Sequence, residues 1–291
     1  MRSIERAVGL CTDSSARLPP DLVDRFRVAV VPATVHVDDR DYLEGIDIGA
    51  DEYDAVVAAG ATITTSEPSA GQFAVAYDEL VARGCTEILS LHGAATVSGT
   101  VSAARLAAHR AGVPVRIIDT GTAGFGVACC VWAAAEALAA GATADEVTAH
   151  VESAAPRVGH VFVADPASWC DDALLVQPGG VDDPTGSISV LGVRDGALEL
   201  VGCVIGNQDA IDTMVDRVVE LGTGLRVGVG MADRAMADLV DGLEAALRAH
   251  PAVDEVVRYR IGPSVGAHVG RRTVGCFTLP RVLGQSTPAA S

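Results

Sequence analysis

The stretch "TEILSLH" (86–92), followed after a short loop by "TVSGTVSAARL" (96–106), decides the fold. The first run is short and almost continuously apolar, which is typical of a strand buried on both faces. The second run is rich in alanine and predicts a helix. A strand, a loop and a helix in this order form the repeating unit of a parallel sheet with helices on both faces.

The same unit occurs on either side of this stretch. "AVGLCTD" (7–13) and "VPVRIID" (113–119) predict two more strands, and helices are expected over 70–83, 99–111 and 121–140. The sequence therefore predicts an α/β protein whose N-terminal half is a Rossmann-like parallel sheet with flanking helices. In such sheets ligands bind where the carboxyl ends of the strands enter the helices.

Two features divide the chain further. Residues 28–48 hold two strand-like runs around an acidic turn and predict a hairpin excursion inside an N-terminal domain, 1–156. After about residue 156 strands dominate, which predicts a C-terminal α+β lobe over 157–283 and a tail over 284–291. The expected strands of this lobe are 160–165, 187–206 with a hairpin turn at Asp195-Gly196, 225–231 and 254–262, and helices are expected at 207–221 and 233–249.

Composition and charge exclude several functions. The 291 residues carry a net charge of −17, which opposes binding to nucleic acid and to anionic membranes. Seven scattered cysteines without a C-x-x-C pair argue against a zinc site and favour reduced thiols in the cytoplasm. The apolar stretch 124–142 contains Glu136 and is mostly alanine, so it predicts a buried helix and not a membrane span.

Hydroxyl side chains gather at three of the predicted loops. In "ITTSEPSAGQF" (63–73), Ser69 and Gln72 fit a capping box, which leaves Thr65 and Ser66 just ahead of a helix N-terminus. Such hydroxyls usually satisfy only the backbone of a loop. The other two loops place further polar residues ahead of helices: Ser98 and Gly99 after one strand, and Asp13, Ser14 and Ser15 after another. All three loops are expected to lie at the same edge of the predicted parallel sheet, which favours a polar site for an anion there.

His268 is the most site-like of the seven histidines. It lies between Gly266 and Gly270, in a segment that is too rich in glycine for a stable helix, and two arginines follow it. Its imidazole could donate a hydrogen bond to a carboxylate or a phosphate. The chain has no G-x-x-x-x-G-K-[ST] loop, so the sequence does not support an ATP site. Its one G-x-S-x-G match, "GPSVG" (262–266), lies in this glycine-rich segment and precedes no expected helix, so an α/β-hydrolase nucleophile has no support either.

Six short motifs occur in the following order along the chain: "TDSS" (12–15), "VVPATV" (30–35), "TTSEPS" (64–69), "VSGTVSAA" (97–104), "IIDT" (117–120) and "GAHVG" (266–270). This ordered set resembles the motifs of the DegV family. The pattern T-S-x-P-S followed by S-G-T is the specific part of the resemblance, which covers nearly the whole chain.

The resemblance implies two lobes with a long-chain fatty acid between them. Its carboxylate would be bound by Thr65, Ser66, Ser98 and His268. The rest of the pocket would include Asp13, Ser14, Gly99 and Thr100. The resemblance also implies that the protein is not an enzyme and needs neither metal nor cofactor. It would present the acid to a separate fatty acid kinase subunit.

Two alternatives stay open at the level of sequence. One is a small-molecule transferase or hydrolase that uses His268 and Ser98. The other is a lipid buffer or sensor that has lost the kinase contact, because basic residues expected by the resemblance are missing from 167–180. A small polar cleft would favour the enzyme, whereas a long apolar tunnel would favour lipid binding.

Overall fold

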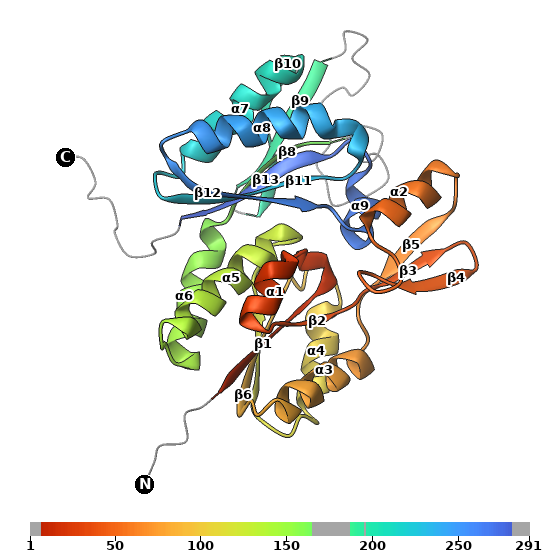
Figure 1. Ribbon diagram of the computed structural model, residues 1–291, viewed down its shortest axis with the longest axis vertical. Coiled ribbons are helices and arrows are strands. Elements are labelled where there is room, and N and C mark those ends of the chain that lie inside the picture. Colours follow the sequence, from red (N-terminus) through yellow and green to blue (C-terminus); the bar gives the residue numbers. More distant parts are fainter. Residues whose placement is uncertain (1–6, 165–186, 195, 281–291) are drawn as a thin grey trace, which may run out of the picture.

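The computed structural model describes residues 7–164, 187–194 and 196–280 (Figure 1). Its first half contains the predicted parallel sheet, in the strand order β2-β1-β6-β7. The strands are β1 (Val8–Asp13), β2 (Ala29–Val31), β6 (Glu87–His92) and β7 (Val115–Asp119). The three strands predicted from the apolar runs are therefore confirmed, and β2 is an additional edge strand.

Helices cover both faces of this sheet because its strands alternate between two apolar sides. Leu10, Leu89 and Leu91 pack against α5 and α6, whereas Cys11 and Ile88 pack on the opposite face against α3 and α4. The helices around this sheet are α1 (Pro20–Phe26), α3 (Ala70–Ala82), α4 (Thr100–Ala108), α5 (Phe125–Ala139) and α6 (Ala144–Ala154). The sequence predicted α3, α4 and α5, but it missed α1, α6 and a further helix, α2 (Ala50–Ala58).

A separate antiparallel sheet extends from the first half, in the order β4-β3-β5 (Figure 1). Its strands are β3 (Thr34–Val37), β4 (Arg40–Leu43) and β5 (Ile63–Ser66), and α2 (Ala50–Ala58) packs against it. The hairpin predicted over 28–48 is present as β3 and β4, but Ala29–Val31 belongs to the parallel sheet.

The expectation that β5 ends at the edge of the parallel sheet is wrong. The run "ITTS" alternates, with Thr64 exposed, which suits a strand that has one solvated face. It pairs with β3 in the register Val35 to Thr65 and Val37 to Ile63. The hydroxyls of β5 therefore come from a different sheet than Asp13 and Ser98.

The second half forms a six-stranded mixed sheet, β10-β9-β8-β13-β11-β12. The strands are β8 (Gly159–Val163), β9 (Ser187–Arg194), β10 (Ala197–Ile205), β11 (Leu225–Met231), β12 (Val253–Arg260) and β13 (Val274–Pro280). Arg194 pairs with Ala197 in the predicted hairpin, although Asp195 itself lies outside the described residues. The sequence missed β13, which is central in the sheet. Most of the loop 177–187, and the tail 284–291, also lie outside the described residues.

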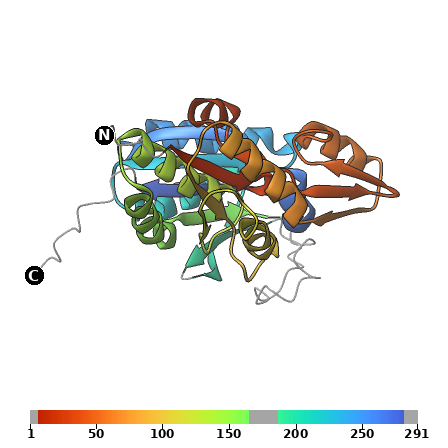
Figure 2. The same cartoon turned by 90° about the horizontal axis from the view of Figure 1, so that it is seen from below.

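Helices α7 (Asn207–Val219) and α8 (Ala237–Ala249) cover one face of this sheet, and α5 lies against the other (Figures 1 and 2). The ring of Phe125 occupies the space above Gly228, and the guanidinium of Arg226 stacks 3.6 Å from the Trp132 ring and pairs with Glu136. The stretch 124–142 is thus a buried helix between the sheets. Among the described residues, no helix is long and apolar enough to span a bilayer.

Gly275 provides a test of this packing. A Cβ atom there would lie 2.7 Å from the carbonyl oxygen of Val161 and 2.9 Å from the Cα of Phe162, in the neighbouring strand. Because backbone atoms cannot move aside cheaply, Gly275→Ala is expected to destabilise the protein by about 1–3 kcal/mol in urea denaturation. The matched control is Gly112→Ala, where a Cβ would meet no atom within 4 Å. Equal stabilities of the two variants would contradict this packing.

Candidate functional site

The structure brings together two of the predicted site residues from distant parts of the chain. Thr65 lies on β5, and His268 lies on α9 (Pro263–Val269), which packs against β5. The Oγ1 atom of Thr65 is 3.2 Å from the Nε2 atom of His268. This contact joins the small antiparallel sheet to the second half of the chain.

The expectation that His268 lies in a non-helical segment is wrong. Helix α9 begins with Pro263 in its first position, after an extended Gly262, and ends at Gly270 with φ 81°. Gly266 is needed for packing, because a Cβ there would lie 3.2 Å from the ring of Tyr53 on α2. The glycines therefore end the helix and allow its close contact, without preventing the helix.

Ser66 does not join Thr65 and His268. Successive side chains of a strand point to opposite faces, and the hydroxyl of Ser66 lies 3.1 Å from Nε2 of His36, on the other face of β5. The Nδ1 atom of His36 is in turn 2.7 Å from a carboxylate oxygen of Asp41. Ser66 is thus bound within the small sheet.

The second predicted loop forms the start of α4. The Oγ atom of Ser98 is 2.7 Å from Oγ1 of Thr100 and accepts a hydrogen bond from the Thr100 amide at 3.2 Å. Gly99 is the last residue before the helix, and the carboxylate of Glu67 lies directly over it. The loop after β5 therefore touches the start of α4, although the described residues show no hydrogen bond from Ser98 to Thr65 or His268.

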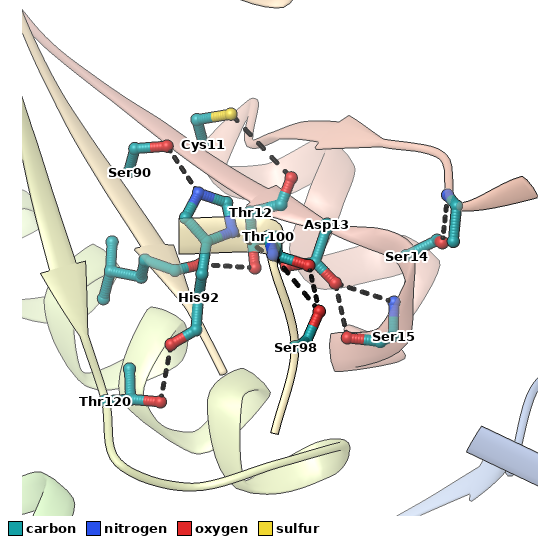
Figure 3. Close-up of polar contacts among 12 residues, drawn as sticks. Cys11, Thr12, Asp13, Ser14, Ser15, Ser90, His92, Ser98, Thr100 and Thr120 are labelled. Carbon is teal, nitrogen blue, oxygen red and sulfur yellow. Dashed lines mark hydrogen bonds and ion pairs between the residues drawn. The ribbon is translucent and has the colours of Figure 1, made fainter. Parts of the chain in front are cut away.

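Asp13 and Ser14 are buried and engaged by other side chains (Figure 3). Asp13 is 2% exposed, and its Oδ2 atom is 2.8 Å from Nδ1 of His92 on the neighbouring strand. Ser14 donates to Glu44 at 2.6 Å and accepts from the Ala33 amide at 2.9 Å. These contacts fix the end of β1 and leave neither side chain open to solvent.

A buried polar chain that the sequence interpretation missed runs through the parallel sheet, and Figure 3 shows its part from Asp13 to Ser90. From Asp13 it continues through His92 to Ser90 at 2.7 Å and on to the Tyr77 hydroxyl at 2.9 Å. Burial raises the pKa of the Tyr77 phenol and raises that of the nearby Cys11 thiol to about 12, so both groups stay protonated. The sequence feature that could have indicated this chain is the pair Ser90 and His92, two polar residues two positions apart in an otherwise apolar strand.

The order Asp13, His92, Ser90 resembles a hydrolase triad, but it cannot act as one. Ser90 and His92 have no exposed surface, so a substrate cannot reach the hydroxyl. The chain instead satisfies polar groups between β1 and β6, as buried polar groups require.

Glu44 is a second buried group that the sequence interpretation missed. It follows β4, is 2% exposed, and accepts hydrogen bonds from Ser14 and, at 3.1 Å, from the backbone amide of Ser264 in α9. One carboxylate thus connects the end of β1, the hairpin and the helix that carries His268. In the sequence, Glu44 appears only as an acidic residue in "YLEGIDI", and no sequence rule distinguishes it there from an ordinary exposed turn residue.

Ion pairs hold α2 against the second half of the chain. Arg234 pairs with Asp51 at 2.6 Å, and Arg260 pairs with Asp51 at 3.0 Å and with Asp54 at 2.6 Å. The Arg234 guanidinium lowers the pKa of Asp51, whereas burial raises the pKa of Asp54. Together with Glu44, these pairs fix the position of the small sheet and hence of Thr65.

Two surface cavities lie away from these residues. One of about 230 Å³ is lined by Glu136, His150 and Arg226, and another of about 320 Å³ by Glu87, Arg116 and Asp145. Neither is lined by a predicted site residue. Within the part of the chain that the structure describes, no group of three or more His, Cys, Asp or Glu side chains could hold a metal ion.

Comparisons with known proteins agree with the motifs. The sequence model of the DegV family, described as a family of uncharacterised proteins, matches residues 7–168 and 188–281. A DegV domain-containing protein of Mycobacterium bovis is 31% identical over 299 residues, covering 97% of this chain and 99% of the relative. One of Streptomyces coelicolor is 29% identical over 292 residues, covering 96% and 100%.

Solved structures share the fold. A DegV family protein from Thermus thermophilus, described as binding fatty acid, is 28% identical and superposes with a TM-score of 0.83 over 94% of this chain and 99% of that protein. A DegV lipid-binding protein from Thermotoga maritima, at 24% identity, has the same TM-score over 96% and 100% and supports the fold. The two-lobed α/β architecture and the family match over nearly all of its length show that this chain belongs to the DegV family.

Proposed function

We propose that this protein binds a long-chain fatty acid, with the carboxylate bound between the loop after β5, the start of α4 and α9. The observation that carries the proposal is the 3.2 Å contact between Thr65 and His268, which joins the two halves of the chain at predicted site residues. The relative from Thermus thermophilus, described as binding fatty acid, supports the ligand class.

The physical chemistry of a fatty acid fits these groups. Burying an acyl chain contributes roughly 0.8 kcal/mol per methylene, so a sixteen-carbon chain provides on the order of 10 kcal/mol before the costs of binding. The carboxylate must exchange water for protein donors. In this proposal Thr65, Ser98 and His268 supply them, with Gly99 and Thr100 beside Ser98 at the helix start.

The remaining predicted residues take supporting roles. Ser66 is bound by His36, and Asp13 and Ser14 are bound by His92 and Glu44. In our proposal they hold the loops in place and do not contact the carboxylate. This narrows the predicted set of binding residues to Thr65, Ser98 and His268.

The role is binding without catalysis, and the protein would present the acid to a separate fatty acid kinase in the cytoplasm without using a cofactor. The alternative transferase or hydrolase needs Ser98 activated by His268, but the Ser98 hydroxyl pairs with Thr100. A lipid buffer or sensor would use the same binding residues and would differ only in lacking the kinase contact.

Substitution of the hydroxyls tests the carboxylate position. Thr65→Ala and Ser98→Ala are each expected to weaken fatty-acid binding by about 1–3 kcal/mol, because a charged group loses a donor. Equilibrium dialysis with radiolabelled hexadecanoate measures the change. The matched controls are Thr64→Ala, on the exposed side of β5, and Ser102→Ala, on the exposed side of α4. If both test variants bind as tightly as the controls, the carboxylate lies elsewhere.

A further inference from the structure

Glu67 places a negative charge inside the proposed carboxylate site. It occupies the unspecified position of the T-S-x-P-S pattern, so the motif does not require this charge. Its carboxylate lies over Gly99, at the start of the nine-residue helix α4 and next to Ser98. A Cβ atom at Gly99 would lie only 3.1 Å from the Cδ atom of Glu67.

The backbone on both sides of this contact is fixed. Before Glu67, Ser66 pairs with Thr34 in the small sheet; after it, Pro68 is buried and Ser69 caps α3 through the amide of Gln72. Opposite it, the Ser98 hydroxyl accepts from the Thr100 amide and fixes the start of α4. The backbone that carries Glu67 is therefore held beside the start of α4.

Glu67 is exposed, and among residues 7–164, 187–194 and 196–280 it takes part in no ion pair or side-chain hydrogen bond. A second carboxylate arriving beside Ser98 would meet this like charge, and the repulsion disfavours it even though solvent around the exposed Glu67 weakens the effect. An uncharged head group would meet no such repulsion. Because the acyl chain is the same in both cases, the difference would lie in the head group alone.

We propose that Glu67 determines head-group specificity by disfavouring ionised fatty acids relative to uncharged long-chain lipids such as alcohols, esters and amides. The proposal rests on the proposed function, because it assumes that the head group lies at Ser98. It narrows the ligand class by charge and attributes the selection to one side chain.

The experiment compares Glu67→Gln with the wild-type protein in equilibrium dialysis against hexadecanoate and hexadecan-1-ol. Glutamine keeps the shape and removes the charge. We expect hexadecanoate to bind roughly 2- to 5-fold more tightly to the variant, with the affinity for hexadecan-1-ol unchanged. Added salt should strengthen hexadecanoate binding to the wild-type protein more than to the variant, because salt screens repulsion between charges.

Glu79→Gln is the matched control, since Glu79 lies on the exposed side of α3 next to Arg83 and should change neither affinity. An unchanged hexadecanoate affinity in Glu67→Gln, or an equal change for both ligands, overturns the role of Glu67. If Ser98→Ala weakens hexadecanoate binding in the same series, the proposed function still stands. If the wild-type protein binds neither ligand, or Ser98→Ala has no effect, the proposed carboxylate site fails, and the role of Glu67 fails with it.

Discussion

Replacing His92 by alanine is expected to lower the free energy of unfolding by about 3–5 kcal/mol, because two buried polar groups lose a hydrogen-bond partner, at about 1–3 kcal/mol each, and a cavity is left. The Asp13 carboxylate, 2% exposed, would lose the imidazole 2.8 Å away, and Ser90 would lose its contact at 2.7 Å. The ring of Phe73, which meets the imidazole edge-on with centroids 5.0 Å apart, would also border a cavity.

Urea denaturation followed by circular dichroism measures this loss. The matched control is His109→Ala, at the exposed end of α4, which should change stability little. A His92→Ala variant as stable as this control would show that the chain from Asp13 to Tyr77 does not stabilise the parallel sheet. Because the chain lies inside the sheet, the loss should be the same with and without fatty acid.

Glu44→Ala is expected to have the second-largest effect, about 2–5 kcal/mol. The substitution leaves the buried Ser14 hydroxyl and the Ser264 amide without their acceptor, at about 1–3 kcal/mol for each group. Because Glu44 also positions the start of α9, the contact between Thr65 and His268 should loosen. Fatty-acid affinity should therefore fall together with stability.

Thermal denaturation and hexadecanoate dialysis on the same preparation separate the two effects. Glu44→Gln keeps one carbonyl acceptor and should lie between the wild-type protein and the alanine variant. Asp39→Ala, in the exposed turn of the same hairpin, is the matched control. Full stability of Glu44→Ala would mean that this carboxylate does not connect α9 to the hairpin.

The parallel sheet was predictable because its central strands, β1 and β6, are buried on both faces and form nearly continuous apolar runs. β7, at the edge, is only partly buried, but its run "VPVRIID" keeps the aliphatic pattern. Ser69 and Gln72 form a capping box that the local sequence specifies. The register of β5 was not predictable, because a four-residue β-branched run pairs equally well in two kinds of sheet. The pairing with β3 decides between the two sheets, and β3 lies too far from β5 in the sequence for the local pattern to reveal it.

The proposed site could be predicted only in part. Thr65 and His268 were predicted as site residues, but their contact spans 203 positions and depends on α9, whose glycines the sequence interpretation took as evidence against a helix. His92 and Glu44 were missed because burial, which gives each its role, is a property of the packed chain. Ser66 was grouped with Thr65 because both were expected in a loop, whereas in β5 successive side chains point to opposite faces.

Lipid mass spectrometry after denaturing extraction of the purified protein is the most direct test of fatty-acid binding. If the site binds as proposed, the extract contains about one long-chain acid or uncharged long-chain lipid per chain, and less from Ser98→Ala. An extract without lipid, together with no thermal shift on adding hexadecanoate or hexadecan-1-ol, would contradict lipid binding and favour an enzyme with a small polar substrate.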